Sequence, residues 1–542
     1  MKNRRLLTKS FTALILGSAG IMLVSACDGR GQAAPANALG ATPSAAIGGG
    51  TGAVGTVIPN GPSTGGVAAA PPAIIPVVAG TGGAPPVVNT AGAAGVAAPA
   101  AAGAGAGIGG VAPAVPVTSG LSEWRVMGYS AASTYFNTAE TVLTKANAAT
   151  LEVAWQADMG DNVYGAALQV GDKIYASSGT VVQAFNAADG AKLWRNTRAG
   201  TTAAMSYDEV DGGTLYLNNN AGQVVALKAA DGVQKWAQAP TTQTADGSSS
   251  PVVAGDYVLV GGSAGSQEIL GTSRFRGYLA ALDKVTGSVK WVGYTVPENA
   301  RGASLWSSGS ADLLNKRAYG ATGNNHGTPN TDSSDAIIAF DLDTGAIIWK
   351  NQRTKNDNWS GSSAGPDHDF GANPVLYETL VNGVMTQMVS GAQKSGSAHG
   401  FRRDTGEMLW TRSLGGGSNN GAAGVFTNAT WSGKNMLFAC NGGGGSTLYA
   451  LDGATGEIAW QRTLTGAVYG RISVANGVGF VGAGSSLEVF DIDTGANIKT
   501  IAGKGGTLAS TITIANGRVA FGEGMSWNAS RTGSTLTVLK VK

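Results

Sequence analysis

The sequence has few of the residues that common metal and disulfide sites require. Its 542 residues include 2 Cys and 3 His. Cys27 lies in an N-terminal leader, so Cys440 has no partner for a disulfide within the chain once Cys27 is modified. His326, His368 and His399 are too scattered for a zinc site, and we interpret them as polar loop residues. No CxxCH occurs, which excludes a covalently bound c-type haem.

Charge is also scarce. Only 13% of the residues are charged, and the formal net charge is +2. The Lys and Arg residues of the body are scattered rather than clustered, so no nucleic-acid partner is predicted. The sequence is instead rich in glycine, with 84 Gly. This composition is typical of an all-β, turn-rich protein with a non-globular stretch, and it argues against a helical enzyme.

The first 27 residues have the pattern of a secretory signal: a basic start, an apolar middle and small residues before Cys27. The ending LVSAC resembles a bacterial lipobox, in which the cysteine receives lipid. We predict a lipoprotein signal over 1–27 and lipidation at Cys27. The alternative is an ordinary signal peptide or a short membrane anchor. The prediction implies a bacterial cell envelope, with the protein held by lipid and facing the periplasm or the cell surface.

A second N-terminal segment separates this leader from the rest of the chain. No charged residue occurs between Gly31 and Ser122, where Ala, Gly, Pro, Val and Thr dominate. Such a tract lacks the periodicity and the large side chains that a core needs. We predict a disordered linker over 28–120 and a folded domain over 121–542.

One hairpin pattern organises the folded domain. In AFDLDTGAIIW (339–349), two apolar runs flank an Asp and a Thr-Gly turn, which predicts a β-hairpin. The pattern recurs along the chain, which is the signature of a propeller or another repeat array. Its members end at residues 194, 236, 291, 349, 410, 460 and 500, and an isolated second half ends at Trp155.

The two ends of the domain predict how the ring closes. Three strand-like runs follow the last hairpin, at 507–515, 518–522 and 534–542, and one run, 151–155, precedes the first hairpin. Together they supply the four strands of one blade. The sequence therefore predicts an eight-bladed β-propeller whose N-terminal strand completes the last blade and leaves no open sheet edge.

The repeat AxDxxTGxxxW resembles the tryptophan-docking motif of the pyrroloquinoline quinone (PQQ) propeller superfamily. The resemblance covers Trp155 to Lys542 and implies the same fold. It also implies that each repeated Trp packs between neighbouring blades and that each repeated Gly forms a turn. The superfamily contains enzymes and non-catalytic scaffolds, so fold alone does not decide the activity.

The three longest repeats, which end at residues 291, 349 and 410, contain unusual polar insertions. The segments GGSAGSQE, RGASLWSS, TGNN, GPDHDFGANP and GAQKSG resemble quinoprotein alcohol dehydrogenases, and GPDHDFGANP is similar to the form seen in polyvinyl-alcohol dehydrogenases. The resemblance implies that Glu268 and Asn324 bind Ca²⁺ together with Asp369, that Trp306 lies beneath PQQ, and that Lys394 lies beside the quinone oxygen.

The chemistry of these residue types agrees with those roles. Ca²⁺ prefers six to eight oxygen ligands, a general base takes the alcohol proton, and a cation stabilises charge on a carbonyl oxygen. We assign the base to Asp369 rather than Asp367 because Asp369 immediately precedes Phe370-Gly371. Ser249 and Ser250 are candidates for contacts with cofactor carboxylates, although a turn at a strand entry explains them equally well.

The chain also departs from the family. It has no adjacent cysteines, and Tyr164 stands where the family has a glutamate. We predict oxidation of a secondary alcohol, with polymeric alcohols among the candidates, and electron transfer to a separate cytochrome c or membrane quinone. The alternatives are a non-catalytic lipoprotein that resembles the outer-membrane assembly scaffold, and a module that binds polysaccharide or protein through loops such as 415–421.

Overall fold

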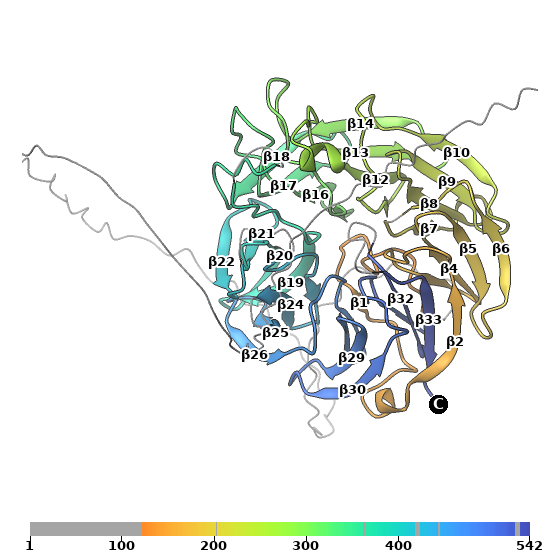
Figure 1. The fold of residues 1–542 in the computed structure, drawn as a ribbon. Coiled ribbons are helices and arrows are strands. Elements are labelled where there is room, and N and C mark those ends of the chain that lie inside the picture. The colour runs from red at the N-terminus through yellow and green to blue at the C-terminus, as the bar shows by residue number, and fades with distance from the viewer. Residues whose placement is uncertain (1–121, 202, 361–364, 418–422, 443–444, 526–531) are drawn as a thin grey trace, which may run out of the picture. The chain divides into compact units, whose positions relative to one another are not determined.

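The computed structural model describes residues 122–201, 203–360, 365–417, 423–442, 445–525 and 532–542 (Figure 1). The predicted lipoprotein signal over 1–27, with Cys27, and the predicted linker over 28–120 lie outside these residues. Within the described residues, no helix has the length and apolar character needed to cross a membrane.

Eight sheets are arranged in a ring, which confirms the predicted eight-bladed propeller (Figure 1). Blades 1 to 4 follow in chain order: β3 (Leu168–Val170), β4 (Lys173–Ser177), β5 (Val182–Asn186) and β6 (Lys192–Asn196); β7 (Ser206–Asp208), β8 (Thr214–Asn218), β9 (Val224–Lys228) and β10 (Gln234–Gln238); β11 (Val252–Ala254), β12 (Tyr257–Gly262), β13 (Tyr278–Asp283) and β14 (Val289–Tyr294); β15 (Ser310–Asp312), β16 (Arg317–Ala321), β17 (Ala336–Asp341) and β18 (Ile347–Gln352).

Blades 5 to 8 continue the ring: β19 (Val375–Val381), β20 (Val384–Ala392), β21 (Ser397–Arg402) and β22 (Met408–Ser413); β23 (Thr430–Trp431), β24 (Asn435–Gly442), β25 (Gly445–Asp452) and β26 (Ile458–Thr463); β27 (Ser473–Ala475), β28 (Val478–Ala483), β29 (Ser486–Asp491) and β30 (Asn497–Ala502), with β1 (Phe136–Asn137) added; β31 (Thr513–Ala515), β32 (Arg518–Gly522), β33 (Thr535–Lys540) and β2 (Glu152–Asp158). The described helices are short: η1 (Ala148–Thr150), η2 (Val210–Gly212) and α1 (Ser266–Ile269).

The ring closes as the sequence predicts. The N-terminal strand β2 pairs antiparallel with the C-terminal strand β33, and Trp155 lies opposite Val538. The predicted strand over 507–515 is shorter in the structure, where only β31 pairs with β32. The innermost strands of blades 1 to 4 and of blade 7 are equally short, at three residues each.

Repeated tryptophans dock seven of the eight blades onto the next blade. Trp410 of β22 packs over Gly456 of blade 6, whose φ is +69°, and a Cβ at Gly456 would lie 2.6 Å from the indole ring. The indole N–H donates to the carbonyl of Gly453 at 3.1 Å. Only glycine fits both the left-handed backbone and the ring contact. The same hydrogen bond to the next blade is made by Trp155, Trp194, Trp291, Trp349 and Trp460.

Blade 7 replaces the docking tryptophan with a lysine. Lys499 of β30 lies opposite Val489, the register that Trp410 and its counterparts occupy in other blades. Its ammonium donates to the carbonyls of Ala149 and Leu151 at 2.9 and 2.6 Å, just before β2. A charge-assisted hydrogen bond therefore joins blade 7 to blade 8 at the place where the two ends of the chain meet.

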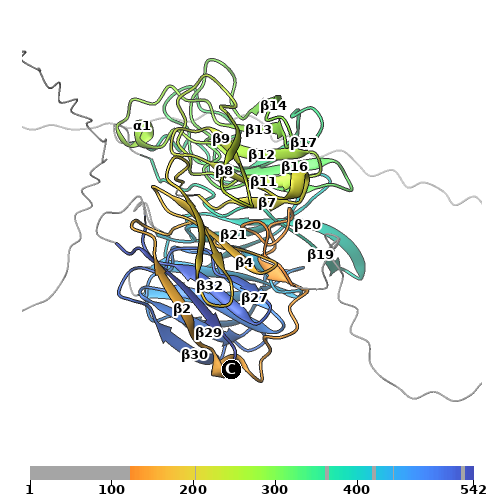
Figure 2. The ribbon, with the colours of Figure 1, turned by 90° about the vertical axis from the view of Figure 1, so that its right-hand side faces the viewer.

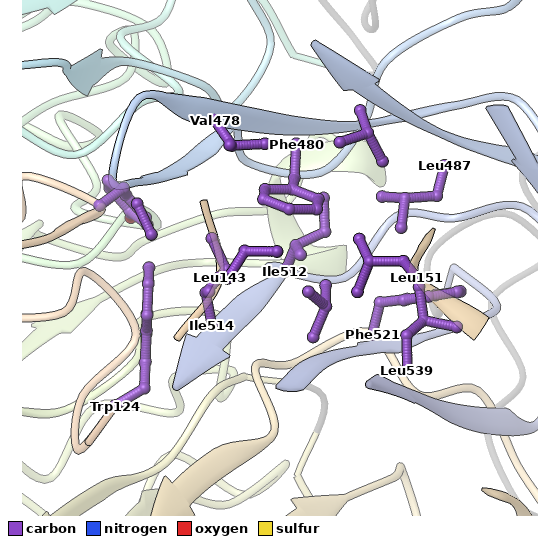
Figure 3. Close-up of a cluster of buried hydrophobic side chains, with 14 of the residues drawn as sticks. Trp124, Leu143, Leu151, Val478, Phe480, Leu487, Ile512, Ile514, Phe521 and Leu539 are labelled. Carbon is purple, nitrogen blue, oxygen red and sulfur yellow. The ribbon is translucent and has the colours of Figure 1, made fainter. Parts of the chain in front are cut away.

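Residues 122–137, which we call the N-terminal strip, run along the inside of the ring. The strip forms backbone hydrogen bonds or bridges with the innermost strands or adjoining residues of blades 1, 2, 4, 5, 6 and 7. Asn137 adds a side-chain bond to the carbonyl of Ile514 in blade 8. Figure 3 shows Trp124 of the strip in one core cluster with Phe480 of blade 7 and Leu539 of blade 8.

Strand alternation determines which loops share a face. Because neighbouring strands of a blade run antiparallel, the loop after the second strand and the connection after the fourth strand emerge at the same end. The loops β12–β13, β16–β17 and β20–β21 and the connections β14–β15 and β18–β19 therefore lie on one face. Figure 2 agrees: α1, from the β12–β13 loop, and the β19–β20 hairpin lie on opposite faces.

Candidate active site

The candidate site is built from this loop face, mainly between blades 4 and 5. Asp369 lies in the β18–β19 connection, Lys394 in the β20–β21 loop, Asn324 in the β16–β17 loop and Trp306 in the β14–β15 connection. The structure brings the other three predicted residues into contact with Asp369.

Asp369 is the centre of the contacts. Its Oδ1 accepts the backbone N–H of Asn324 at 2.8 Å. Its Oδ2 accepts the ammonium of Lys394 at 2.8 Å and the indole N–H of Trp306 at 3.2 Å. A Cβ at Gly323 would lie 2.8 Å from Oδ1, so a glycine is needed for this close approach. The carboxylate is buried and held by three donors from three loops.

Lys394 joins two buried carboxylates. Its ammonium lies 2.8 Å from Asp367 and 2.8 Å from Asp369, and 5.4 Å from the centre of the Trp306 ring. Burial alone would lower the pKa of Lys394, but the charges of Asp369 and Asp367 outweigh it and raise that pKa. The side chain therefore stays cationic next to the aromatic face.

Asp367 differs from Asp369 in its surroundings. Burial is the largest influence on the Asp367 carboxyl, and the charges of Asp369 and Glu268 add to it, so its pKa is raised to about 7 although Lys394 opposes the change. Its φ of +56° is left-handed. Both carboxyl groups therefore interact with the same ammonium, that of Lys394, but the pKa of Asp367 is raised.

Two buried acids near this pair, Asp335 and Asp357, were not predicted from the sequence. Asp335 is fully buried, and neither carboxyl oxygen has a hydrogen-bond partner among the described residues. Burial, followed by the charges of Asp369 and Asp357, raises the pKa of Asp335 well above its ordinary value. Burial also raises the pKa of Asp357, which accepts the backbone N–H of His368. No local pattern distinguishes these acids from surface loop residues.

Asn324 has one spare acceptor. Its amide nitrogen donates to the carbonyls of Asn325 at 2.9 Å and Trp359 at 2.5 Å. Its Oδ1 is buried and has no hydrogen-bond donor within the described part of the chain. An amide oxygen fixed in this way and lacking a donor is a suitable ligand for a hard cation.

Glu268 lies on α1, in the neighbouring blade 3. Its Oε2 is 3.0 Å from Nε2 of His326. Its charge contributes to the raised pKa of Asp367, which places it in the electrostatic reach of the site. His326 itself is in the β16–β17 loop, as predicted, but its side chain is only 2% exposed.

The prediction for His399 is wrong. This residue belongs to strand β21 rather than to a loop, and its ring is buried between Phe370 and Phe401 at centroid distances of 5.8 and 6.0 Å. Burial lowers its pKa to about 3. His399 is a core residue.

Ser249 and Ser250 are buried and engaged with the main chain. Ser249 Oγ accepts the N–H of Gly261 at 2.9 Å, and Ser250 Oγ accepts the N–H of Ala204 at 2.9 Å. Such hydrogen bonds are expected of a turn at a strand entry, which is the alternative explanation that the sequence offered for these serines. Their predicted contact with a cofactor stays a prediction.

Aromatic rings continue the apolar surface beyond Trp306. The Trp306 ring lies 5.8 Å from Phe426, which in turn meets Tyr469 edge-on at 6.2 Å. Tyr164 packs against the same cluster. The site therefore has one charged side, with Asp369 and Lys394, and one aromatic side.

Comparison with known families agrees with this architecture. Residues 101–351 and 394–541 match the PQQ-repeat family described as "Outer membrane protein assembly factor BamB". The chain belongs to this family. The predicted membership of the PQQ propeller superfamily is thereby confirmed. The unmatched stretch between the two parts, 352–393, contains Asp367 and Asp369.

Polyvinylalcohol dehydrogenases are among the sequence relatives. A polyvinylalcohol dehydrogenase of Sphingopyxis sp. (strain 113P3) is 27% identical over 459 residues, which cover 71% of this chain and 70% of the relative. A polyvinylalcohol dehydrogenase of Pseudomonas sp. is 28% identical over 317 residues, which cover 52% of this chain and 49% of the relative. The chain thus spans about half the length of the Pseudomonas relative.

Solved structures show the same fold. The quinohemoprotein alcohol dehydrogenase from Comamonas testosteroni superposes with a TM-score of 0.64 at 18% identity, covering 77% of this chain and 80% of that protein. A europium-containing methanol dehydrogenase superposes with a TM-score of 0.60 at 17% identity, covering 78% of this chain and 99% of that protein. At these identities the likeness concerns the fold.

Proposed function

We propose that this chain is a PQQ- and Ca²⁺-dependent alcohol dehydrogenase that oxidises a secondary alcohol, polymeric alcohols included. The observation that carries the proposal is the buried Asp369, held by Asn324, Trp306 and Lys394 at 2.8 to 3.2 Å. The dehydrogenase relatives support the same reaction class, because their names state oxidation of an alcohol.

Two side-chain oxygens and one aromatic face support the proposed metal and cofactor. Asn324 offers a buried oxygen that has no donor among the described residues, and Glu268 adds a carboxylate from the next blade. Trp306 offers a flat apolar face to a planar ring, with the Lys394 cation 5.4 Å from that face. When bound, PQQ with its metal ion supplies the electrophilic carbonyl that accepts the hydride.

The carboxylate of Asp369 is arranged to accept a proton. A carboxylate oxygen has two lone pairs. Oδ2 already accepts two hydrogen bonds, whereas Oδ1 accepts one, from Asn324. Oδ1 is therefore the atom at which Asp369 takes the hydroxyl proton of the alcohol. If Asp369 also bound the metal ion, it would use the lone pair of Oδ1 that accepts the proton. We therefore assign Glu268 and Asn324 as the principal protein ligands.

Lys394 and the aromatic side complete the proposed site. The ammonium of Lys394 stabilises negative charge that develops on an oxygen near the Trp306 face. Trp306, Phe426 and Tyr469 exclude water from that side, which strengthens the electrostatic interactions of Asp369 and Lys394. An apolar wall of this kind suits an alcohol with hydrocarbon substituents.

The decisive experiment adds PQQ and Ca²⁺ to the purified chain and follows reduction of an artificial dye with secondary alcohols. Asp369→Asn keeps the size of the side chain but removes the base, so turnover should fall by about 10²- to 10⁴-fold. PQQ should still be retained. Exposed Asp343→Asn, at a hairpin turn, is the control. Turnover of Asp369→Asn within tenfold of the control would contradict the assignment of the base.

A second candidate function is a non-catalytic scaffold, because the matching family is described by an outer-membrane assembly factor. A scaffold has no need for buried Asp367, Asp369 and Lys394, and the stretch with both aspartates lies outside the matched residues. Failure of the chain to retain PQQ at micromolar concentrations would favour the scaffold. The third alternative, binding through 415–421, involves residues 418–421, which lie outside the described residues.

We further propose that Cys27 carries lipid, that 28–120 is a linker to the propeller domain over 121–542, and that the protein lies in a bacterial cell envelope. Electrons would then pass to a cytochrome c or a membrane quinone. The lipobox pattern before Cys27 supports this proposal. Radiolabelled palmitate should enter the wild-type chain and not Cys27→Ser; equal labelling of both would refute lipidation at this residue.

A further inference from the structure

Glu268 and His326 join two blades at the edge of the candidate site. Glu268 belongs to the β12–β13 loop of blade 3, and His326 belongs to the β16–β17 loop of blade 4. Nε2 of His326 lies 3.0 Å from Oε2 of Glu268, and the two side chains are 2% and 15% exposed. A carboxylate–imidazole contact that is shielded in this way is stronger than one in water.

The His326 ring is also fixed from its other side. Nδ1 lies 2.8 Å from the hydroxyl of Ser273, and the Ser273 oxygen accepts the N–H of Phe275 at 3.2 Å. The backbone N–H of His326 donates to the carbonyl of Arg301 at 3.1 Å. In the tautomer with a proton on Nε2, the ring donates to Glu268 and accepts the Ser273 proton, so both ring nitrogens are satisfied.

The same loop carries the amide that we assign as a metal ligand. Asn324 precedes His326 by two residues, and its amide nitrogen is anchored to the carbonyls of Asn325 and Trp359. Glu268 lies on α1, a single turn of four residues, and within the described part of the chain its carboxylate makes one ion-pair contact, that with His326. The contact with His326 therefore ties Glu268 to the loop of Asn324.

We propose that His326 is a positioning residue: it holds one oxygen of Glu268 so that the carboxylate and Asn324 act as one preformed cation site. The inference rests on the proposed function. Hydrogen bonds to a ligating side chain fix its orientation, and their loss costs about 10- to 100-fold in metal affinity. His326→Ala should therefore raise the Ca²⁺ concentration for half-saturation by about that factor.

The test uses the full chain and three variants. His326→Ala removes the contact, and His326→Gln keeps an N–H donor of similar reach. Thr272→Ala is the matched control, because Thr272 is exposed in the loop of Glu268. Ca²⁺ is titrated into each protein, first with PQQ and then without it, by calorimetry. The melting temperature is measured with and without Ca²⁺, which separates metal binding from folding.

The proposal expects weaker Ca²⁺ binding and a smaller Ca²⁺-induced rise in melting temperature for His326→Ala, with partial recovery in His326→Gln. The melting temperature without Ca²⁺ should stay close to that of Thr272→Ala. Unchanged Ca²⁺ affinity in His326→Ala would overturn the proposal. The proposal would also be overturned if His326→Gln lost as much Ca²⁺ affinity as His326→Ala and both melted at a lower temperature without Ca²⁺. That result would assign His326 to the folding of the loop. If the wild type binds neither PQQ nor Ca²⁺, the proposed function itself fails.

Discussion

Replacement of the buried histidine His399 by glutamine should flatten the dependence of stability on acid. His399 lies in β21 between two phenylalanines, and its Nδ1 and Nε2 lie 2.9 Å from Thr411 and 3.3 Å from Gln393. Burial is the main cause of its low pKa, with the Arg353 charge in support. The folded protein therefore keeps this imidazole neutral in mildly acidic solution.

The sign of the effect follows from linkage. In the unfolded chain, His399 binds a proton below its ordinary pKa of 6.5, whereas in the folded chain it does so only near pH 3. Between these values the unfolded state binds more protons, so stability falls as the pH falls. Each pKa unit corresponds to about 1.4 kcal/mol. Lowering the pH from 7.5 to 5 should therefore cost the wild type roughly 2 kcal/mol through His399 alone.

The assay is denaturant unfolding of wild type and His399→Gln at pH 7.5 and pH 5. Glutamine does not titrate, so the stability lost on acidification should be smaller in the variant by roughly 2 kcal/mol. The variant also loses ring packing against Phe370 and Phe401, which lowers its stability by a similar amount at both pH values.

A control separates titration from packing. Thr411→Val removes the hydroxyl partner of the ring but keeps the imidazole, so it should lower stability at both pH values and preserve the acid dependence of the wild type. The reasoning is refuted if His399→Gln and the wild type lose the same stability on acidification.

Two further substitutions test the site and the ring closure. Gly323→Ala would place a methyl group 2.8 Å from Oδ1 of Asp369 and displace the carboxylate. Dye-linked turnover should therefore fall by about 10²-fold with little change in melting temperature. Unchanged turnover would refute the steric argument. Lys499→Ala would remove the donor to the carbonyls of Ala149 and Leu151. Denaturant unfolding should show a free energy of unfolding about 1–2 kcal/mol lower than that of the control Lys504→Ala. Equal stabilities of the two variants would show that water replaces the ammonium.

The fold could be predicted because the repeat records it many times. Every hairpin has a turn glycine and all but the last end on a tryptophan. This pattern predicts the number of blades and the pairing of the strand at Trp155 with the C-terminal strand. The lysine that replaces the tryptophan between blades 7 and 8 was not predictable. Lys499 has the aliphatic and charged character of an ordinary surface residue, and its role depends on carbonyls of 149 and 151 that lie some 350 residues away in sequence.

The candidate site was predictable only in part. Asp369, Lys394, Asn324 and Trp306 lie in distinctive segments, and the structure brings them into contact. Buried Asp335 has no local signal, because nothing in its neighbouring residues reveals the loops that cover it. His399 shows the converse case: a polar residue type suggested a loop, whereas tertiary packing placed it in a strand.

The buried ionisable groups of the loop face support the proposed enzymatic function. Replacing a buried ion pair by apolar residues is often neutral or stabilising, and the propeller repeats use tryptophan and glycine for cohesion elsewhere. Yet Asp335, Asp367, Asp369 and Lys394 are all buried within adjoining loops of blades 4 and 5. Asp335 even lacks a hydrogen-bond partner among the described residues. Structures tolerate such costs at functional sites, where local rules of stability are broken. Under the proposed function, a site that moves a proton requires such ionisable groups, whereas a scaffold that binds partners through its surface has no need for them.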